Sequence, residues 1–121
     1  MTREDPREQQ NLLTAFIDGS NVYGSDQQAL DELRAPKGKM KTTGNGKLLP
    51  KGKDEDCIRT DAPYCFMAGD ERVHVFPGLT ALHTLFVRIH NQIAEELYVN
   101  TVFDDEEIFH ETRKIVSALL Q

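Results

Sequence analysis

The longest helical pattern in this chain is Leu79-Thr80-Ala81-Leu82-His83-Thr84-Leu85-Phe86-Val87-Arg88-Ile89-His90-Asn91-Gln92-Ile93-Ala94-Glu95-Glu96-Leu97. Its apolar residues recur every three or four positions, the period of one helix face: Leu79, Leu82, Phe86, Ile89, Ile93 and Leu97. Pro77-Gly78 directly precedes the run, and proline is favoured in the first turn of a helix. The sequence therefore predicts a long helix that begins at Pro77-Gly78 and ends near Val99-Asn100, with this stripe as its apolar face.

A second helix is predicted from Asp104 or Asp105 to the end of the chain. Four acidic residues begin it, at the end of the helix where negative charge is favourable. Its apolar stripe would comprise Ile108, Thr112, Ile115 and Leu119, with Val116 and Leu120 beside it. The pattern still runs at Gln121 without a glycine or proline, so we expect the sequence to be an internal piece of a larger domain.

Upstream of the long helix the apolar residues are unevenly distributed. They concentrate at 12–22 and 79–121, which predicts two patches of core rather than one. A short helix is expected over 26–34, capped by Gly24-Ser25 and stopped by Pro36, and a helical turn over 8–17. Glycines and prolines predict a long irregular loop over 37–63, with Lys47-Leu48-Leu49 as a short extended piece. Its six lysines indicate a solvated segment rather than an anion site.

Composition and charge exclude several classes of protein. The chain has 121 residues, 39% hydrophobic and 28% charged, which is ordinary for a soluble domain. With 14 Lys and Arg against 20 Asp and Glu the net charge is −6, which argues against binding to nucleic acid. No window reaches the ~20 apolar residues that span a bilayer. Residues 1–8 are charged and lack the apolar region of a secretory signal.

Cys57 and Cys65 lie eight positions apart among Asp, Pro and Tyr residues, which is typical of a loop staple. Closing so short a loop would stabilise the fold by roughly 2.5 kcal/mol. A disulfide indicates an oxidising compartment, and loss of upstream sequence would reconcile this with the missing signal. A zinc site from these cysteines and two histidines has no recognised ligand spacing. We expect His90-Asn91 to make structural hydrogen bonds instead.

Residues 14–20, Thr14-Ala15-Phe16-Ile17-Asp18-Gly19-Ser20, place an oxygen donor at every second position. This is how a chain winds around a hard cation such as calcium. Thr14 and Ser20 would supply hydroxyls, Asp18 a carboxylate and Phe16 a carbonyl. Thr14 could add its own carbonyl, giving about five oxygens but a single formal charge. The alternative is that Asp18 and Ser20 only cap the following turn.

The run Ala68-Gly69-Asp70-Glu71-Arg72 sets an arginine just before the long helix. Arginine is always charged and presents a rigid fork of donors, so it suits a site that binds or develops negative charge. The alternative is a surface arginine paired with Asp70 or Glu71, a contact that contributes little to stability.

Four blocks of the sequence, in this order, resemble the animal haem peroxidases, the myeloperoxidase and peroxidasin superfamily: residues 7–25, 63–72, 79–94 and 113–121. The resemblance covers nearly the whole chain outside the lysine-rich loop. It implies a mainly α fold, part of the animal haem peroxidase fold, with helices joined by a calcium-binding loop and a long irregular loop. Residues 1–121 would form an internal part of one domain, with the distal and proximal histidines lying before and after it.

The resemblance also implies roles for individual residues. Thr14, Phe16, Asp18 and Ser20 would ligate a structural calcium ion, the fifth ligand being an acid upstream of Met1, and Cys57 and Cys65 would form the family's short disulfide. Arg72 would be the distal arginine above haem b, where its charge stabilises the peroxide anion by ~3–4 kcal/mol. Many members carry a glutamate esterified to the haem, and some a methionine, at positions that are Val75 and Phe76 here. The haem would therefore lack that link, while apolar contact with its ring remains.

The implied function is a secreted, haem-dependent peroxidase active in the response to oxidative stress. It would couple the reduction of hydrogen peroxide to oxidation of a halide or a small organic donor. None of His74, His83, His90 and His110 matches a haem-site motif. Without the axial ligand and the distal base we expect these 121 residues alone to be inactive, the missing partners being flanking segments of the same domain. The alternatives are a non-catalytic, secreted, calcium-binding adhesion module on the same scaffold, or a small intracellular helical interaction protein with free thiols.

Overall fold

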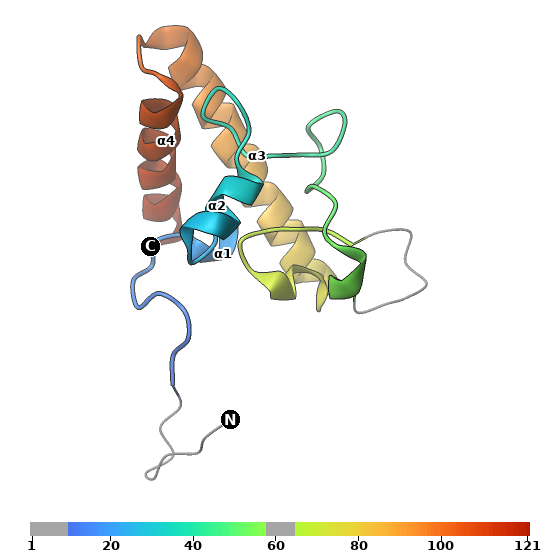
Figure 1. Cartoon of the computed structure of the whole chain (residues 1–121). Helices are drawn as coiled ribbons and strands as arrows, with labels where there is room; N and C mark the ends of the chain where they lie inside the picture. Colours follow the sequence, from blue (N-terminus) through green and yellow to red (C-terminus); the bar gives the residue numbers. More distant parts are fainter. Residues whose placement is uncertain (1–9, 58–64) are drawn as a thin grey trace.

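The structure, a computed structural model, describes residues 10–57 and 65–121 (Figure 1). Its elements are, in order, α1 (Ser20–Tyr23), α2 (Gln27–Leu33), the short 3-10 helices η1 (Asp54–Asp56) and η2 (Glu71–His74), α3 (Pro77–Asn100) and α4 (Asp105–Leu120). Within the described residues, β pairing is limited to the isolated bridges Arg34–Met40 and Lys51–Phe66. The predicted mainly α fold with a long irregular loop is confirmed. No helix in this part of the chain has the length and apolar character to cross a membrane.

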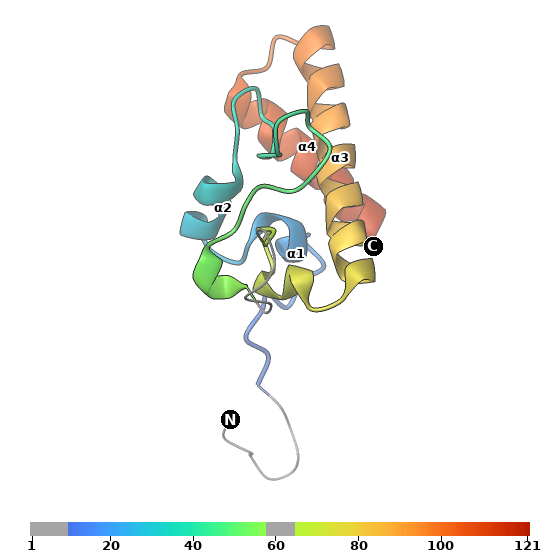
Figure 2. The same ribbon diagram turned by 90° about the vertical axis from the view of Figure 1, so that its right-hand side faces the viewer.

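Helices α3 and α4 form a hairpin, and Figures 1 and 2 show the shorter elements lying beside it. Pro77 occupies the first turn of α3, and the helix ends at Asn100, as predicted. A capping box begins α4, because Asp104 accepts from the Glu107 amide while the Glu107 carboxylate accepts from the Asp104 amide, both at 2.9 Å. Residues close to the first turn of each helix therefore mark where the helix begins.

The buried faces of the two helices agree only in part with the predicted stripes. Phe86, Ile89 and Ile93 of the α3 stripe pack against the core while partly buried, and Ile108 and Thr112 of the α4 stripe are buried as predicted. On α3 the buried residues are His83, Val87, His90 and Ala94, whereas Leu82 is 55% exposed. On α4 they are Ile108, Phe109, Thr112 and Val116, whereas Ile115 and Leu119 are 43% and 59% exposed. Apolar residues lie on more than one side of each helix, so their period alone does not select the face that the neighbours cover.

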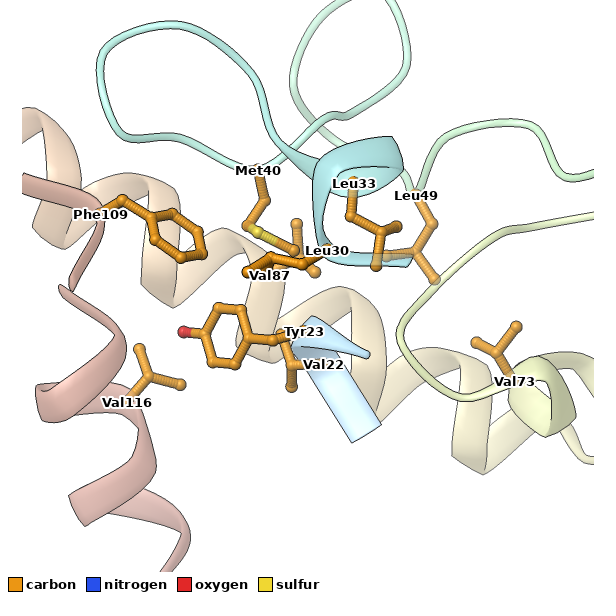
Figure 3. Close-up of a cluster of buried hydrophobic side chains, with 10 residues drawn as sticks. All are labelled: Val22, Tyr23, Leu30, Leu33, Met40, Leu49, Val73, Val87, Phe109 and Val116. Carbon is orange, nitrogen blue, oxygen red and sulfur yellow. The ribbon is translucent and has the colours of Figure 1, made fainter. Parts of the chain in front are cut away.

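One hydrophobic cluster joins α1, α2, η2, α3 and α4 (Figure 3). The rings of Tyr23 in α1 and Phe109 in α4 pack edge to face, with centroids 5.8 Å apart. Met40 and Leu49 of the irregular loop are buried in the same cluster. The prediction of two core patches is therefore wrong, because the loop contributes side chains that connect the N-terminal apolar region to the helix hairpin.

Three details of the N-terminal half also differ from prediction. Helix α2 is capped by Asp26, whose carboxylate accepts from the Ala29 amide at 2.8 Å, rather than by Gly24-Ser25. Residues 10–17 bend without forming a helical turn, while the rest of the predicted turn, at 8–9, lies outside the described residues. Residues 47–49 bend and do not form an extended piece.

Side chains of α3 hold the irregular loop by its backbone. The side chain of Asn91 accepts from the Met40 amide at 2.7 Å and donates to the Met40 carbonyl at 2.9 Å. The ring of His90 contacts the Gly38 carbonyl at 2.9 Å. Gly38 has φ 64°, and a Cβ there would lie 2.5 Å from a methyl carbon of Ile108, so glycine is required. The structural hydrogen bonds predicted for His90-Asn91 are confirmed.

His90 is fully buried, and both of its ring nitrogens are paired. The Gly38 carbonyl can only accept, so Nε2 carries the proton, and Nδ1 accepts from the Tyr23 hydroxyl at 2.8 Å. Burial lowers the pKa of His90 to about 4 and raises that of Tyr23, so both side chains are neutral at pH 7. This polar cluster belongs to the interior of the scaffold.

Candidate functional site

Three of the four predicted calcium ligands converge in the cation loop, residues 14–20, whose last residue, Ser20, begins α1. Oγ1 of Thr14 lies 3.0 Å from Oδ1 of Asp18 and 2.9 Å from Oγ of Ser20. The same Asp18 oxygen accepts from the Ser20 amide at 3.0 Å, so Asp18 also caps the turn, as in the alternative interpretation. The fourth predicted ligand, Phe16, is 83% exposed. It would contribute its backbone carbonyl and not its side chain. Hydroxyl and carboxylate oxygens within reach of one another are the donors that calcium accepts.

The loop carries one ionised carboxylate. Burial alone raises the pKa of Asp18, but hydrogen bonds from Ser20 and Thr14 and the charge of Arg113 together bring it below its ordinary value. In the parts of the chain that the structure describes, no three His, Cys, Asp or Glu side chains gather as a metal site. The donor set therefore fits a weak site for a hard cation and does not fit a zinc or copper centre.

Arg72 lies in η2, immediately before α3, and forms a forked pair with Asp70. The distances are 3.0 Å from Nε to Oδ1 and 2.7 Å from Nη2 to Oδ2. Hydrogen bonding to the guanidinium lowers the pKa of Asp70 and raises that of Arg72. The Arg72 side chain is nevertheless 62% exposed, and Nη1 has no hydrogen-bond partner among the described residues. The surface pairing considered as the alternative is thus present, and it uses Nε and Nη2 but not Nη1.

Gly69 packs the arginine segment, residues 65–72, against α1, the helix that begins at the last residue of the cation loop. A Cβ at Gly69 would lie 2.2 Å from the Gly24 amide nitrogen and 2.5 Å from the Ser20 carbonyl oxygen. Only glycine allows backbone segments to approach this closely. The two predicted sites therefore share α1, since Ser20 is a candidate cation ligand and also contacts the segment that carries Arg72.

Arg72 lines a depression of about 800 Å³, together with His74 and Phe66 among other residues. The next residues along the chain, Val75 and Phe76, are 61% and 66% exposed. An exposed cation that is followed along the chain by exposed apolar side chains fits one edge of a haem, which has an apolar ring and anionic substituents or ligands. Neither Val75 nor Phe76 has a group that can form an ester with it.

Of the four histidines, only His74 lines the Arg72 depression. His83 and His90 are buried in the scaffold, and His110 lies on α4 with its Nε2 3.6 Å from Glu106. His74 Nδ1 is buried without a hydrogen-bond partner among the described residues. Sequence reasoning did not single out His74; its spacing of two residues from Arg72 was the only signal available.

The segment that leads to Arg72 is tied down by a disulfide. Cys57 and Cys65 are bonded, with their Cα atoms 5.5 Å apart, as predicted. The Cys65 carbonyl accepts from the Gly52 amide at 2.7 Å, and the Met67 amide donates to the Pro50 carbonyl at 2.9 Å. The bond excludes a zinc site that uses these two thiolates and anchors one end of the arginine segment.

Several known proteins are similar to this chain in sequence and in fold. The family model for the animal haem peroxidases matches residues 1–121. Peroxidasin homologues from Caenorhabditis briggsae and Homo sapiens are 46% and 43% identical over 95% and 96% of this chain. Human myeloperoxidase is 39% identical over 95% of it. The chain spans only 10%, 9% and 17% of the lengths of these three proteins.

Among solved structures, peroxidase A from Dictyostelium discoideum matches 88% of this chain with a TM-score of 0.75 and 29% identity, and 23% of that protein is covered. A fatty acid alpha-dioxygenase from Arabidopsis thaliana matches 87% of the chain with a TM-score of 0.69 and 26% identity, with 15% of it covered. The family model extends over every residue, and the fold agrees with that of a solved peroxidase. The chain therefore belongs to the animal haem peroxidase family.

Proposed function

We propose that residues 1–121 form an internal part of one haem peroxidase domain, whose distal and proximal histidines lie outside these residues. The domain would reduce hydrogen peroxide and oxidise a halide or a small organic donor. Family membership supports this proposal, and the observation that carries it is the exposed, forked Arg72, which exposed Val75 and Phe76 follow along the chain. We also propose that the protein is secreted, because the Cys57–Cys65 disulfide suits an oxidising compartment.

Arg72 would act on the negative charge of the peroxide. Haem b, when bound, supplies the iron that peroxide oxidises and that in turn oxidises the donor. Asp70 fixes the plane of the Arg72 guanidinium through two hydrogen bonds, so Nη1 is held in one orientation and loses little freedom on binding an anion. It would donate to the peroxide and stabilise the charge that develops as the O–O bond breaks. Val75 and Phe76 would contact the ring without a covalent link.

The calcium ion is proposed to be structural. Thr14, Phe16, Asp18 and Ser20 would supply its ligands from this chain, with one acidic ligand from outside residues 1–121. Because α1 follows the loop directly and packs on Gly69, an ion there would stabilise the segment that positions Arg72.

The proposal is tested by mixing hemin with the purified 121-residue chain and, separately, with a longer product that contains the flanking residues. We expect the short chain to give neither a sharp histidine-ligated Soret band nor oxidation of guaiacol by peroxide. The longer product should give both. Turnover by the short chain would contradict its assignment as an inactive part, and a longer product without haem would contradict the peroxidase assignment.

A second candidate function is a secreted, non-catalytic, calcium-binding adhesion or interaction module on the same scaffold. The apolar Val75 and Phe76 favour it, because they remain exposed and replace the residues that many relatives bond to haem. Flanking genomic sequence separates the two functions: a His-Asp pair upstream and a histidine downstream favour the enzyme, and their absence favours the module. The intracellular alternative predicts free thiols, and the disulfide argues against it.

A further inference from the structure

The C-terminal half of α4 and its C-cap residue, Gln121, contact the cation loop through three residues spaced four apart. Ser117 donates from Oγ to the Asp18 carbonyl at 2.9 Å, and Gln121 donates from Nε2 to the Ile17 carbonyl at 3.0 Å. A guanidinium nitrogen of Arg113 lies 3.8 Å from Oδ2 of Asp18. Residues spaced by four lie on one helix face, and Figure 1 shows the end of α4 beside the segment that enters α1.

Ser117 and Gln121 fix the loop by its backbone. They hold two consecutive carbonyls, at Ile17 and Asp18, in the middle of the candidate ligand set. A Cβ at Gly19 would lie 3.3 Å from the Ser117 hydroxyl, so the loop and helix are closely packed here. Because these contacts keep the Asp18 carboxylate near Thr14 and Ser20, less ordering remains for a cation to impose.

Arg113 acts on the same loop in the opposite sense. Its 3.8 Å distance to Asp18 is longer than a hydrogen bond, so the interaction is one of charge. The guanidinium also lies 5.1 Å from the centroid of the Tyr23 ring, which keeps it near the loop. Asp18 is the only carboxylate among the candidate ligands that this chain supplies, and a fixed positive charge beside it opposes the arrival of another.

We propose that α4 sets the calcium affinity of the loop, with Ser117 and Gln121 raising it by positioning the backbone and Arg113 lowering it by competing for Asp18. The inference rests on the proposed calcium site. By linkage, calcium bound at the loop must strengthen the Ser117 and Gln121 contacts and weaken the Arg113–Asp18 pair, each by the amount that the contact changes calcium affinity.

The positioning half is tested by calcium titration of the full chain, following the amide resonances of Gly19 and Ser20 by NMR up to about 10 mM, above the range of weak extracellular sites. We expect Ser117→Ala to weaken affinity about 3- to 10-fold, the usual worth of one hydrogen bond. The matched control is Thr84→Val, which removes a hydroxyl-to-carbonyl bond of 2.8 Å within α3. It should change affinity less than about twofold, since it leaves the loop contacts intact.

The proposed competition of Arg113 for Asp18 is tested with Arg113→Gln in the same titration. We expect affinity to increase about 3- to 10-fold at low salt, and the gain to shrink as salt screens the charge. Lys114→Gln removes the same charge one residue further on, from a side chain that is 70% exposed and paired with Glu111. It should change affinity less than about twofold.

Opposite shifts for Ser117→Ala and Arg113→Gln, with both controls unchanged, would support the proposal. If either test variant binds calcium as the original chain does, the proposal is overturned. An original chain whose Gly19 and Ser20 resonances do not respond to calcium would overturn the cation site itself. This outcome is distinct from the finding that α4 does not set the calcium affinity.

Discussion

The His90 cluster and the Arg72 segment are both built around a charged or ionisable side chain, but the chain treats them in opposite ways. His90 is fully buried, and both ring nitrogens are paired with groups from distant parts of the sequence. Arg72 is 62% exposed, pairs within the described residues with Asp70 two positions away, and is followed by exposed apolar side chains. The first arrangement is complete within the described residues. The second leaves the Arg72 guanidinium and the apolar side chains of Val75 and Phe76 exposed.

This difference separates scaffold from site. A buried polar group that is fully hydrogen-bonded stabilises one arrangement of the chain and leaves no capacity for a ligand. An exposed guanidinium held in orientation by a forked carboxylate retains that capacity. Substitutions at the His90 cluster should therefore reduce stability, and those at the exposed side chains Arg72, Val75 and Phe76 should reduce function while stability is little changed.

Among substitutions in the segment that carries Arg72, the largest effect on stability is expected at Gly69, where this segment meets the interior. Gly69→Ala places a Cβ against the backbone of α1 on several sides, so we expect a loss of about 4 kcal/mol in the free energy of unfolding, above the usual range for overpacking. Urea unfolding of the full chain measures it. Gly44→Ala is the control, because a Cβ there meets nothing within 4 Å. Equal stability of the two variants would show that the segment does not pack on α1.

The next effect is a dependence of stability on pH that arises from His90. Its pKa is about 4 in the folded chain and ~6.5 when unfolded, so the unfolded state binds more protons between these values. The stabilisation is fully present above pH ~6.5 and is lost as pH falls towards 4, by about 3 kcal/mol in total. Urea unfolding across this range should show it. His90→Gln should lack this part of the dependence, and an unchanged slope in that variant would be evidence against a neutral, buried His90.

A smaller loss is expected from Tyr23→Phe. The hydroxyl donates to Nδ1 of His90 at 2.8 Å, and without it a buried acceptor is unpaired, which costs about 1–2 kcal/mol. Tyr98→Phe provides the matched comparison, because Tyr98 is 43% exposed and should tolerate the change. Thermal or urea unfolding that ranks the two variants equally would contradict the hydrogen bond.

The smallest effect on stability is expected at the exposed apolar residues Val75 and Phe76. Phe76 is 66% exposed, so Phe76→Ala should change the free energy of unfolding by no more than about 0.5 kcal/mol. Phe109→Ala removes the same ring from the core and should cost about 3–5 kcal/mol. A large loss for Phe76→Ala would mean that this side chain is part of the core and is not presented for a partner.

The ends of α3 and α4 were predictable because local residues determine them. Pro77 in the first turn and the Asp104–Glu107 capping box are signals within a few positions of the boundary they set. The buried faces were not predictable in this way. Leu82 and Ile115 fit an apolar period as well as Val87 and Val116 do, and only the placement of neighbouring elements decides which are covered.

The candidate site was predictable in its residue types but not in its connections. Oxygen donors at alternate positions and an arginine before a helix are visible in the sequence, and the first group does converge. The contacts of α4 with the cation loop are not visible, because Ser117 and Asp18 are 99 positions apart. The same holds for His90, whose partners lie 52 and 67 positions away.

The measurement that bears most directly on the proposed site is the rate of haem oxidation by hydrogen peroxide in a peroxidase domain that contains this chain. Stopped-flow absorbance would compare the original domain with Arg72→Gln, which keeps hydrogen-bonding capacity but removes the charge. We expect the variant to react about 100- to 1000-fold more slowly, with its Soret band and thermal stability unchanged. Equal rates in the two proteins would contradict the assignment of Arg72 as the residue that stabilises the charge on peroxide.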